Sequence, residues 1–373
     1  MSQITVTGAP SRYVQGKECI SEAGAHIAKL GNVAFCIGGK RGTACVHDSL
    51  VSSCGEAKVA LTFELFLGEC CLSEIARLQA NATAAGANVI VGIGGGKSID
   101  AAKVVAANMK LPIVIIPTIA ATDAPCSALS VIYTEEGVVS KYEFFPANPD
   151  LVLVDTQIIC EAPSRLLVAG MGDALATFYE AEACCASRSK NCHGGLPSMT
   201  ALCLAKLCRD TLFEYGLAAK HQCESHVTGP ALDHVVEANT LLSGLGFESG
   251  GIAAAHAVHN GLTVCHESHD YYHGEKVAFG VCTQLVLQDS TPEHIEKVQA
   301  FCCSVGLPIT LRQLGIDSKS EEFLKTNLKA VAKGTCLPGE TIHNMPFGIT
   351  EDLVADAILA ADALGEAYLK AHQ

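Results

Sequence analysis

The sequence lacks any long uninterrupted apolar run. Glycine, proline or a charged residue interrupts each hydrophobic stretch before it reaches the roughly 18 residues that a membrane-spanning helix needs. The first residues, MSQITVTGAPSRY, also lack the basic and apolar segments of a secretory signal. We therefore expect a cytoplasmic protein with no membrane partner.

Basic residues are scarce. Lys and Arg number 25 against 39 Asp and Glu, which gives a formal net charge of −14. A broad nucleic-acid-binding surface needs clustered Lys and Arg, so we expect no nucleic-acid partner. Only 17% of the 373 residues are charged and 49% are hydrophobic, a composition that predicts a large buried core and two domains.

The sequence also lacks any C-x-x-C pair, although it has 19 cysteines. Without that spacing, zinc knuckles and thioredoxin-like chemistry lose their usual signal. An odd number of cysteines spread over a long chain does not resemble a disulfide scaffold. We expect reduced cysteines that pack as small hydrophobic residues in a reducing compartment.

Short β-rich segments alternate with helical segments over the first 160 residues. This alternation, with apolar strands, predicts a parallel sheet that helices cover on both faces. The stretch ALSVIYTEEGVVSKYEFF turns at Glu136-Gly137 and predicts a β-hairpin. The predicted strands are residues 33–37, 57–63, 88–92, 112–116 and 151–154, and the predicted helices are residues 21–30, 72–85 and 98–108.

Beyond Pro163, strand patterns nearly vanish and segments rich in Ala, Leu and Glu predict helices. The fold class that follows is an α/β N-terminal domain, residues 1–162, and an all-helical C-terminal domain, residues 163–373. The helices predicted in the second domain include residues 165–187, 198–215, 230–243 and 353–371.

A glycine-rich loop, GIGGGKSIDAAK, follows one predicted strand. It misses the Walker pattern because Val91 stands at the first glycine, and it misses G-x-G-x-x-G because Lys97 stands at the last. Gly94 to Gly96 allow a ligand close to the backbone, and the next helix offers free N–H groups. Ser98 either caps that helix or donates to a phosphate oxygen. The loop predicts a pyrophosphate site, in either a dinucleotide or a nucleoside triphosphate.

Polar side chains follow the next predicted strand, where open α/β sheets bind their ligands. They are Thr118, Thr122, Asp123 and Ser127. Asp123 has an alternative role as the cap of the turn at Ala124-Pro125. A Walker ATPase would also need an acidic residue at a strand end for magnesium. Asp155 in LVLVDT is the one weak candidate, so this class is disfavoured.

Candidate metal ligands gather in the helical half. Asp173 lies in GMGDALATFYEAEA, and His256 and His259 lie one turn apart in ESGGIAAAHAVHNG. One carboxylate and two imidazoles, with one position open, suit catalytic zinc or another divalent ion. Spacing alone does not choose among the histidines. The others are His266, His269 and His273 in HESHDYYHGEKVAFG.

Six segments resemble, in order and spacing, the glycerol dehydrogenases of the iron-containing (group III) alcohol dehydrogenase family. They are GIGGGKSIDAAK, PTIAATDAPCSALSVIYT, GMGDALATFYEAEAC, GFESGGIAAAHAVHNGL, YYHGEKVAFG and GETIHNMP. The resemblance covers nearly the whole chain. It implies a dehydroquinate synthase-like fold with a dinucleotide-binding α/β domain and a metal- and substrate-binding helical domain. It also implies NAD, usually zinc, and a homo-oligomer, often an octamer.

The resemblance implies a role for each motif residue. The implied metal ligands are Asp173, His256 and His273. Thr177 stands where other members of the wider family carry a fourth, histidine ligand, which indicates the three-ligand branch. The remaining histidines, His259, His266 and His269, would support the ligands from outside the metal site or have a structural role. The implied dinucleotide site comprises Gly94, Gly95, Gly96, Lys97, Ser98, Thr118, Ser127, Leu129 and Tyr133. Asp123, Phe247 and the three metal ligands are the implied polyol contacts.

The implied reaction is the oxidation of glycerol to dihydroxyacetone with hydride transfer to NAD, and the metal polarises the alcohol. Asp123 or a water-linked hydroxyl would relay the proton. Gly39 departs from the family, which typically has an aspartate there for the adenosine ribose. Lys40 and Arg41 follow and could meet a 2′-phosphate. The hypothesis is a relaxed preference, with NAD the default and NADP also accepted.

Other enzymes of the same fold are the nearest alternatives. A glycerol-1-phosphate dehydrogenase or a dehydroquinate synthase would need basic residues near the metal, and few surround His256. Small diols such as 1,2-propanediol stay open, because one hydroxyl changes binding little. A non-catalytic dinucleotide-binding protein is disfavoured because all three implied ligands are present. The direction of the reaction and the choice among zinc, iron and manganese are left open.

Overall fold

The computed structural model describes residues 4–372, which form two compact units. Unit 1 contains residues 4–7, 168–220 and 245–372, and unit 2 contains residues 8–167 and 221–244. The second segment of unit 2 lies beyond the predicted boundary at 162/163, so these units and the predicted domains do not comprise the same residues. The two-domain division at that boundary stays a prediction.

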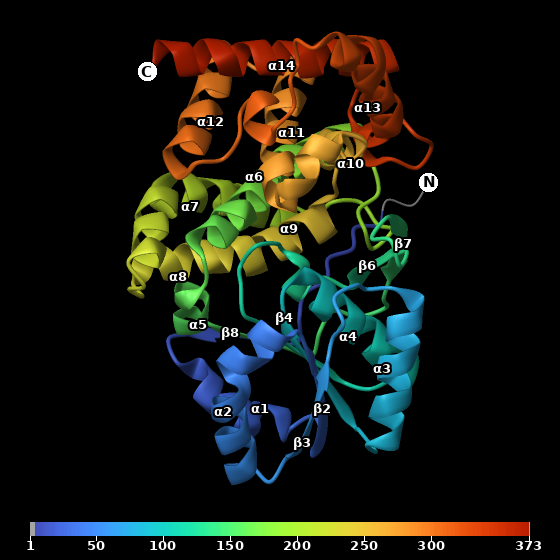
Figure 1. Ribbon diagram of the computed structural model, residues 1–373, viewed down its shortest axis with the longest axis vertical. Coiled ribbons are helices and arrows are strands. Elements are labelled where there is room, and N and C mark those ends of the chain that lie inside the picture. The colour runs from blue at the N-terminus through green and yellow to red at the C-terminus, as the bar shows by residue number, and fades with distance from the viewer. Residues whose placement is uncertain (1–3, 373) are drawn as a thin grey trace. The chain divides into compact units, whose positions relative to one another are not determined.

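A six-stranded parallel sheet forms the centre of unit 2, in the order β1-β8-β5-β4-β2-β3. The prediction of an N-terminal parallel sheet with helices on both faces is confirmed (Figure 1). The strands are β1 (Tyr13–Gly16), β2 (Val33–Gly38), β3 (Ala60–Leu65), β4 (Val89–Gly94), β5 (Ile113–Pro117) and β8 (Leu151–Asp155).

Alternate residues of β2 supply the two faces of this sheet, as the strand period of two requires. Ala34 and Cys36 pack with buried residues of α1 and α2, whereas Phe35 and Ile37 pack with those of α3 and α4. The helices are α1 (Ala23–Ile27), α2 (Lys40–Glu56), α3 (Leu72–Ala84) and α4 (Gly96–Met109). The sheet is therefore the shared wall of two hydrophobic clusters.

Some elements differ from the sequence prediction. α2 has no predicted counterpart, because KRGTACVHDSLVSSCGE is rich in weak helix formers. Val46, Leu50 and Cys54 of this helix are buried against the sheet, and this packing stabilises it. β3 begins three residues later than predicted, since the chain turns at Lys58, where φ is 57°. β1 is an additional edge strand.

The predicted hairpin is present as β6 (Leu129–Tyr133) and β7 (Val139–Phe144), which pair antiparallel. Gly137 in its turn has a φ of 81°, which a glycine adopts without strain. Unit 2 also contains α5 (Thr156–Glu161), α8 (Pro230–Glu237), the 3₁₀ helices η1 (Cys19–Glu22) and η2 (Ala124–Cys126), and a π-helical turn, η3 (Ala238–Leu242). This turn interrupts the helix predicted over residues 230–243.

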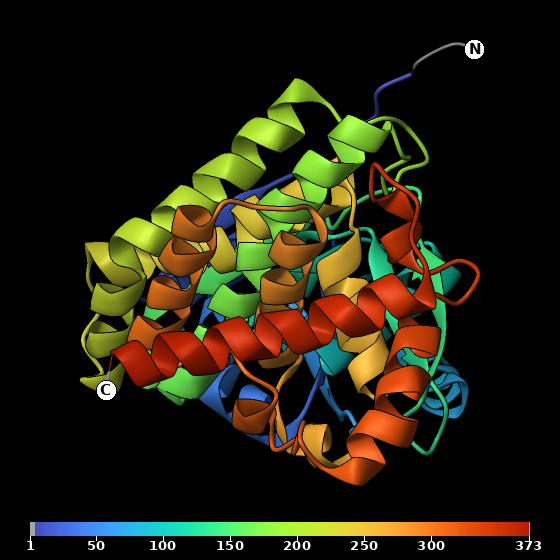
Figure 2. The same ribbon diagram turned by 90° about the horizontal axis from the view of Figure 1, so that it is seen from above.

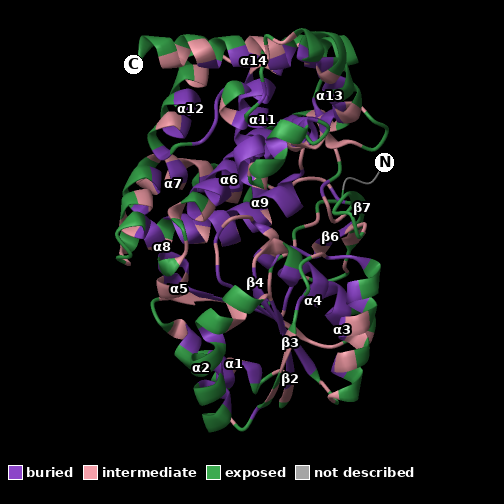
Figure 3. Cartoon of the chain, in the orientation of Figure 1, coloured by how far each residue is buried: buried purple, intermediate pink, exposed green. Residues whose placement is uncertain are grey.

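Unit 1 is mostly helical, as predicted. Its long C-terminal helix, α14 (Glu351–Ala371), packs on α11 (His273–Leu287), α12 (Pro292–Val305) and α13 (Leu328–Thr335) and lies across them in Figure 2. Val354, Ala357, Ile358 and Ala361 form its buried side, and the outer side is exposed (Figure 3). The other α-helices of this unit, some of which extend into unit 2, are α6 (Ser164–Ser187), α7 (Met199–Glu224), α9 (Ser243–Gly250) and α10 (Ala254–Leu262).

Within residues 4–372, none of the helices has both the length and the apolar character needed to cross a bilayer.

Candidate active site

Two carboxylates are buried on one face of α6. Asp173 is 1% exposed and Glu180 is fully buried. They are seven residues apart, which is close to two helical turns, so both side chains leave the helix in nearly the same direction. A buried carboxylate needs a positive or hydrogen-bonding partner, and histidines supply it to both.

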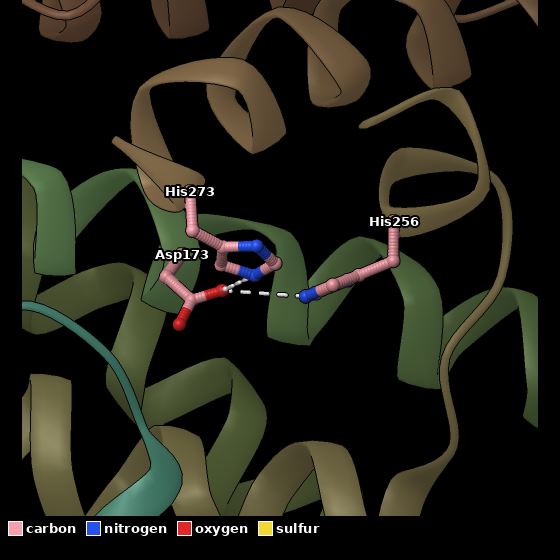
Figure 4. Close-up of side chains that lie close together, drawn as sticks. All are labelled: Asp173, His256 and His273. Atoms are coloured by element: carbon pink, nitrogen blue, oxygen red, sulfur yellow. Dashed lines mark hydrogen bonds and ion pairs between the residues drawn. The ribbon is translucent and has the colours of Figure 1, made fainter. Parts of the chain in front are cut away.

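The first carboxylate lies between two imidazoles. Oδ1 of Asp173 is 3.2 Å from Nε2 of His256, on α10, and 3.2 Å from Nε2 of His273, the first residue of α11 (Figure 4). Each of the three residues offers one ligand atom, and these atoms all lie within 4.8 Å of one another. Over residues 4–372, no other group of three such side chains meets this criterion.

The second carboxylate, Glu180, holds His256 in place. Its Oε1 accepts hydrogen bonds from the backbone N–H groups of Ala253 and His256, each at 2.9 Å. Its Oε2 accepts from Nδ1 of His256 at 2.5 Å. The start of α10 and the imidazole are thus fixed by one side chain, with Nε2 of His256 turned toward Asp173. Sequence reasoning missed Glu180, although its seven-residue spacing from Asp173 is a readable signal.

These contacts move the pKa values in opposite directions. Burial lowers the pKa of His256, but the carboxylates of Glu180 and Asp173 outweigh burial and hold that pKa well above its usual value. Burial raises the pKa of Asp173, but His273 and His256 outweigh burial and hold it well below the usual range. The site is therefore arranged for an ionised carboxylate beside a cationic group, which is the electrostatic setting of a metal ion.

The other histidines have different surroundings. His259 lies against the site, with its Nε2 3.1 Å from Nδ1 of His273. Burial, with an electrostatic contribution from neighbouring His273, holds the pKa of His259 well below its usual value. His266 and His269 are exposed, and His269 contacts the carbonyl of Thr263. The geometry gathers the three residues that the resemblance implied and leaves the two exposed histidines outside.

Thr177, the residue at the fourth-ligand position of the wider family, is fully buried where α6 meets α9. A Cβ built on Gly246 of α9 would lie 2.5 Å from Cγ2 of Thr177, so the two helices are in close contact there. A larger side chain at 177 would collide with α9 unless the backbone moved.

The glycine loop lies at the strand edge where ligands bind in open α/β sheets. β2 and β4 are neighbouring parallel strands, yet α2 packs on one face of the sheet and α4 on the other. This divergence defines a topological switch point at their carboxyl ends. The first turn of α2 approaches the glycine loop closely there, because a Cβ on Gly42 would lie 3.1 Å from Cα of Gly94.

Within the loop, Gly95 is the N-cap of α4, and the helix begins at Gly96. The alternative of Ser98 as the N-cap is therefore wrong. Its hydroxyl instead lies 2.8 Å from the carbonyl of Ile93 and 2.9 Å from that of Gly95, and so closes the loop. Gly94 has a φ of 121°, and a Cβ there would lie 2.8 Å from Oγ of Ser98. Sequence resolves the glycines but not where the helix starts, because glycine is also an acceptable N-cap.

The remaining predicted dinucleotide residues of unit 2 lie around this loop. Lys97 is half-exposed, forms an ion pair with Glu69 at 2.6 Å, and lies 4.8 Å from the ring centre of Tyr133. Thr118 donates its backbone N–H to Gly94. Buried Lys103 fixes the segment that carries Ser127 and Leu129. Its Nζ lies 3.2 Å from Oγ of Ser127 and 2.7 Å from the carbonyls of Ala124 and Leu129.

Asp123 is 9% exposed and occupies the N-cap position of the 3₁₀ turn that follows it, without a side-chain capping hydrogen bond. Its Oδ2 accepts a hydrogen bond from the buried hydroxyl of Ser243 at 2.7 Å. Ser243 comes directly after the π-helical turn η3, which sequence patterns do not reveal. Phe247, the other predicted polyol contact, is 6% exposed and belongs to unit 1.

Asp155, the weak candidate for a magnesium ligand, is occupied structurally. It is the N-cap of α5 and accepts from the backbone N–H of Gln157 at 2.9 Å. It also accepts from the backbone N–H groups of Glu18 and Ile20, each at 3.0 Å. These contacts leave no place for an ATPase magnesium site at this residue.

Gly39 is the N-cap of α2, with φ −70° and ψ 157°, which any residue can adopt. A Cβ there would meet nothing within 4 Å, so neither space nor backbone conformation requires a glycine. Lys40 and Arg41, in the first turn of α2, are exposed. The tip of β2 therefore carries two basic residues and no carboxylate.

Comparison with known proteins agrees with the fold and with a dehydrogenase. The sequence profile of the iron-containing alcohol dehydrogenases matches residues 10–156. The glycerol dehydrogenase of Pseudomonas putida is 49% identical over 362 residues, covering 97% of this chain and 98% of that protein. That of Thermotoga maritima is 51% identical over 370 residues, covering 97% and 98%. The crystal structure of glycerol dehydrogenase from Schizosaccharomyces pombe has a TM-score of 0.95 at 39% identity, covering 100% of this chain and 93% of that one.

Fold and site together define an oxidoreductase with a place for a dinucleotide and a place for a metal. The chain belongs to the iron-containing alcohol dehydrogenase family.

Proposed function

We propose that this enzyme oxidises glycerol to dihydroxyacetone, and catalyses the reverse reaction, with hydride transfer between the alcohol carbon and NAD. The observation that carries the proposal is the cluster of Asp173, His256 and His273 in a chain about half identical to glycerol dehydrogenases over nearly its whole length. Small polyols are the substrate class, and zinc is the proposed metal.

The donor set fits zinc. One carboxylate oxygen and two imidazole nitrogens are ligands that zinc takes in catalytic sites, where substrate or water occupies the fourth position. Zinc bound by these residues would act as a Lewis acid that lowers the pKa of a substrate hydroxyl. Thr177 supplies no fourth nitrogen, which is compatible with substrate access.

The protein's own groups prepare both reactants. Glu180 accepts the Nδ1 proton of His256 and so leaves Nε2 as the ring nitrogen that would bind the metal. The backbone N–H groups at Gly95 and Gly96, with the helix dipole of α4, would bind the pyrophosphate of NAD. Asp123, held by Ser243, is the proposed acceptor of a substrate hydroxyl proton. Nicotinamide C4 would receive the hydride.

The test is turnover of glycerol with NAD before chelation, after chelation, and after zinc is restored. We expect activity to be lost with the metal and regained with zinc. Asp173→Asn should neither bind zinc tightly nor turn over glycerol, whereas Asp356→Asn, at an exposed carboxylate of α14, should behave as wild type. Zinc binding without turnover of glycerol would contradict the substrate. A protein that binds neither zinc nor NAD would contradict the whole proposal.

A further inference from the structure

The two histidines of the candidate metal site have different hydrogen-bond partners at Nδ1. Nδ1 of His256 donates directly to the buried carboxylate of Glu180. Nδ1 of His273 instead faces another histidine, His259, at 3.1 Å. No role for that contact follows from the fold or from the proposed reaction.

Metal binding at Nε2 of His273 would determine which ring nitrogen of His273 and of His259 carries a hydrogen. If Nε2 of His273 binds metal, its Nδ1 carries the hydrogen and donates to Nε2 of His259. His259 must then carry its own hydrogen on Nδ1, which lies 3.0 Å from Oδ1 of Asn260. The amide nitrogen of Asn260 donates to Oε2 of Glu340 at 3.1 Å. Every link pairs one donor with one acceptor, and the last acceptor is a carboxylate.

The segment that carries Glu340 is fixed to the start of α10. Thr341 donates its hydroxyl to the carbonyl of Ala253 at 2.7 Å, and Asn344 donates its amide to the carbonyl of Ile252 at 2.8 Å. These residues lie in GETIHNMP, a motif with no function assigned from sequence. Two backbone contacts and one side-chain contact therefore attach this motif to the helix that carries His256 and His259.

We propose that His259, Asn260 and Glu340 form a positioning chain that fixes the tautomer and the ring orientation of His273 for metal binding. The inference rests on the proposed role of His273 as a ligand. It assigns to GETIHNMP the task that Glu180 performs for His256. Outer partners of this kind change metal affinity by about 10- to 100-fold when they are removed from histidine ligands.

The experiment is a zinc-affinity measurement on the full-length protein by competition with a chromophoric chelator. His259→Leu removes the acceptor and should raise the zinc dissociation constant about tenfold or more. His259→Gln keeps an amide oxygen close to the position of Nε2 and should stay within about threefold of wild type. His269→Leu, at an exposed histidine that is not part of the positioning chain, is the matched control and should leave the zinc dissociation constant unchanged.

Thermal unfolding of the zinc-stripped variants separates positioning from folding. Loss of a positioning residue lowers the zinc affinity without lowering the midpoint temperature of unfolding. Asn260→Leu interrupts the positioning chain at a second residue if His259→Leu does not fold, and it should also weaken zinc binding. The proposal is overturned if both breaks bind zinc as wild type does, or if His259→Gln loses as much affinity as His259→Leu. A wild-type protein that binds no zinc would instead contradict the proposed function.

Discussion

Glu180 lies 2.5 Å from Nδ1 of His256, and it leaves α6 two turns after Asp173. One helix thus supplies both a candidate metal ligand and the carboxylate that orients a second ligand. A rigid element that carries both groups keeps their separation constant, which a loop would not do.

Replacing Glu180 with Gln should weaken zinc binding by about 10- to 100-fold. The amide oxygen can still accept from the N–H groups of Ala253 and His256, but the amide nitrogen would then face Nδ1 of His256 as a second donor. Chelator competition measures the loss. Glu182→Gln, at an exposed carboxylate of the same helix, is the matched control. Equal zinc affinity in both variants would show that Glu180 does not orient the ligand.

Zinc affinity should also depend on pH. The pKa of His256 lies well above its usual value because Glu180 and Asp173 outweigh burial, so the ring keeps a proton at neutral pH until zinc binds. A raised pKa means that zinc displaces this proton below that pKa, and the affinity rises as pH rises toward it. One displaced proton gives about a tenfold gain per pH unit.

The measurement is zinc competition at pH 6.5, 7.5 and 8.5. Glu180→Gln removes the carboxylate that raises the pKa of His256 most, so its slope with pH should be shallower than that of wild type. A flat wild-type profile over this range would contradict the assignment of the proton to His256.

Much of this structure is readable from the sequence, for physical reasons. The buried strands and the glycines before α4 have strong local signals, so the sheet and its loop are predicted. Asp173, His256 and His273 come from three helices, and spacing alone did not select among the histidines; the family resemblance did. α2 was missed because packing overrides its weak helix propensity. Ser243 and Glu340 act through contacts between distant segments, which no local pattern contains.

The pair of Asp123 and Ser243 predicts a graded loss of activity. Asp123→Asn removes the carboxylate that would accept a substrate proton, and kcat/KM for glycerol should fall by about a hundredfold or more. Ser243→Ala removes one hydrogen bond to that carboxylate and should lower kcat/KM for glycerol about tenfold, because the carboxylate is less well oriented. Steady-state kinetics measure both.

NAD affinity, measured separately, should stay unchanged in these two variants, and Ser225→Ala, at an exposed serine of unit 2, should retain full activity. If Ser243→Ala were as active as wild type, the 2.7 Å contact would have no part in orienting Asp123.

The tip of β2 predicts the coenzyme preference. A carboxylate at this position would accept hydrogen bonds from the adenosine ribose of NAD and repel the 2′-phosphate of NADP. This chain has Gly39 there, followed by exposed Lys40 and Arg41. We expect NAD to be preferred over NADP by less than about a hundredfold, as the ratio of kcat/KM values with glycerol.

Gly39→Asp should raise that ratio at least tenfold, because a close like-charge pair with the 2′-phosphate costs several kcal/mol. The substitution should fold, since the backbone at 39 is extended, a Cβ would meet nothing within 4 Å, and Asp is a favourable N-cap for α2. Gly39→Asn is the matched control, because it has the same shape and capping ability without the charge. If Asp and Asn shift the ratio equally, charge at this position does not select the coenzyme. If wild type already prefers NAD more than about a hundredfold, another residue performs the discrimination.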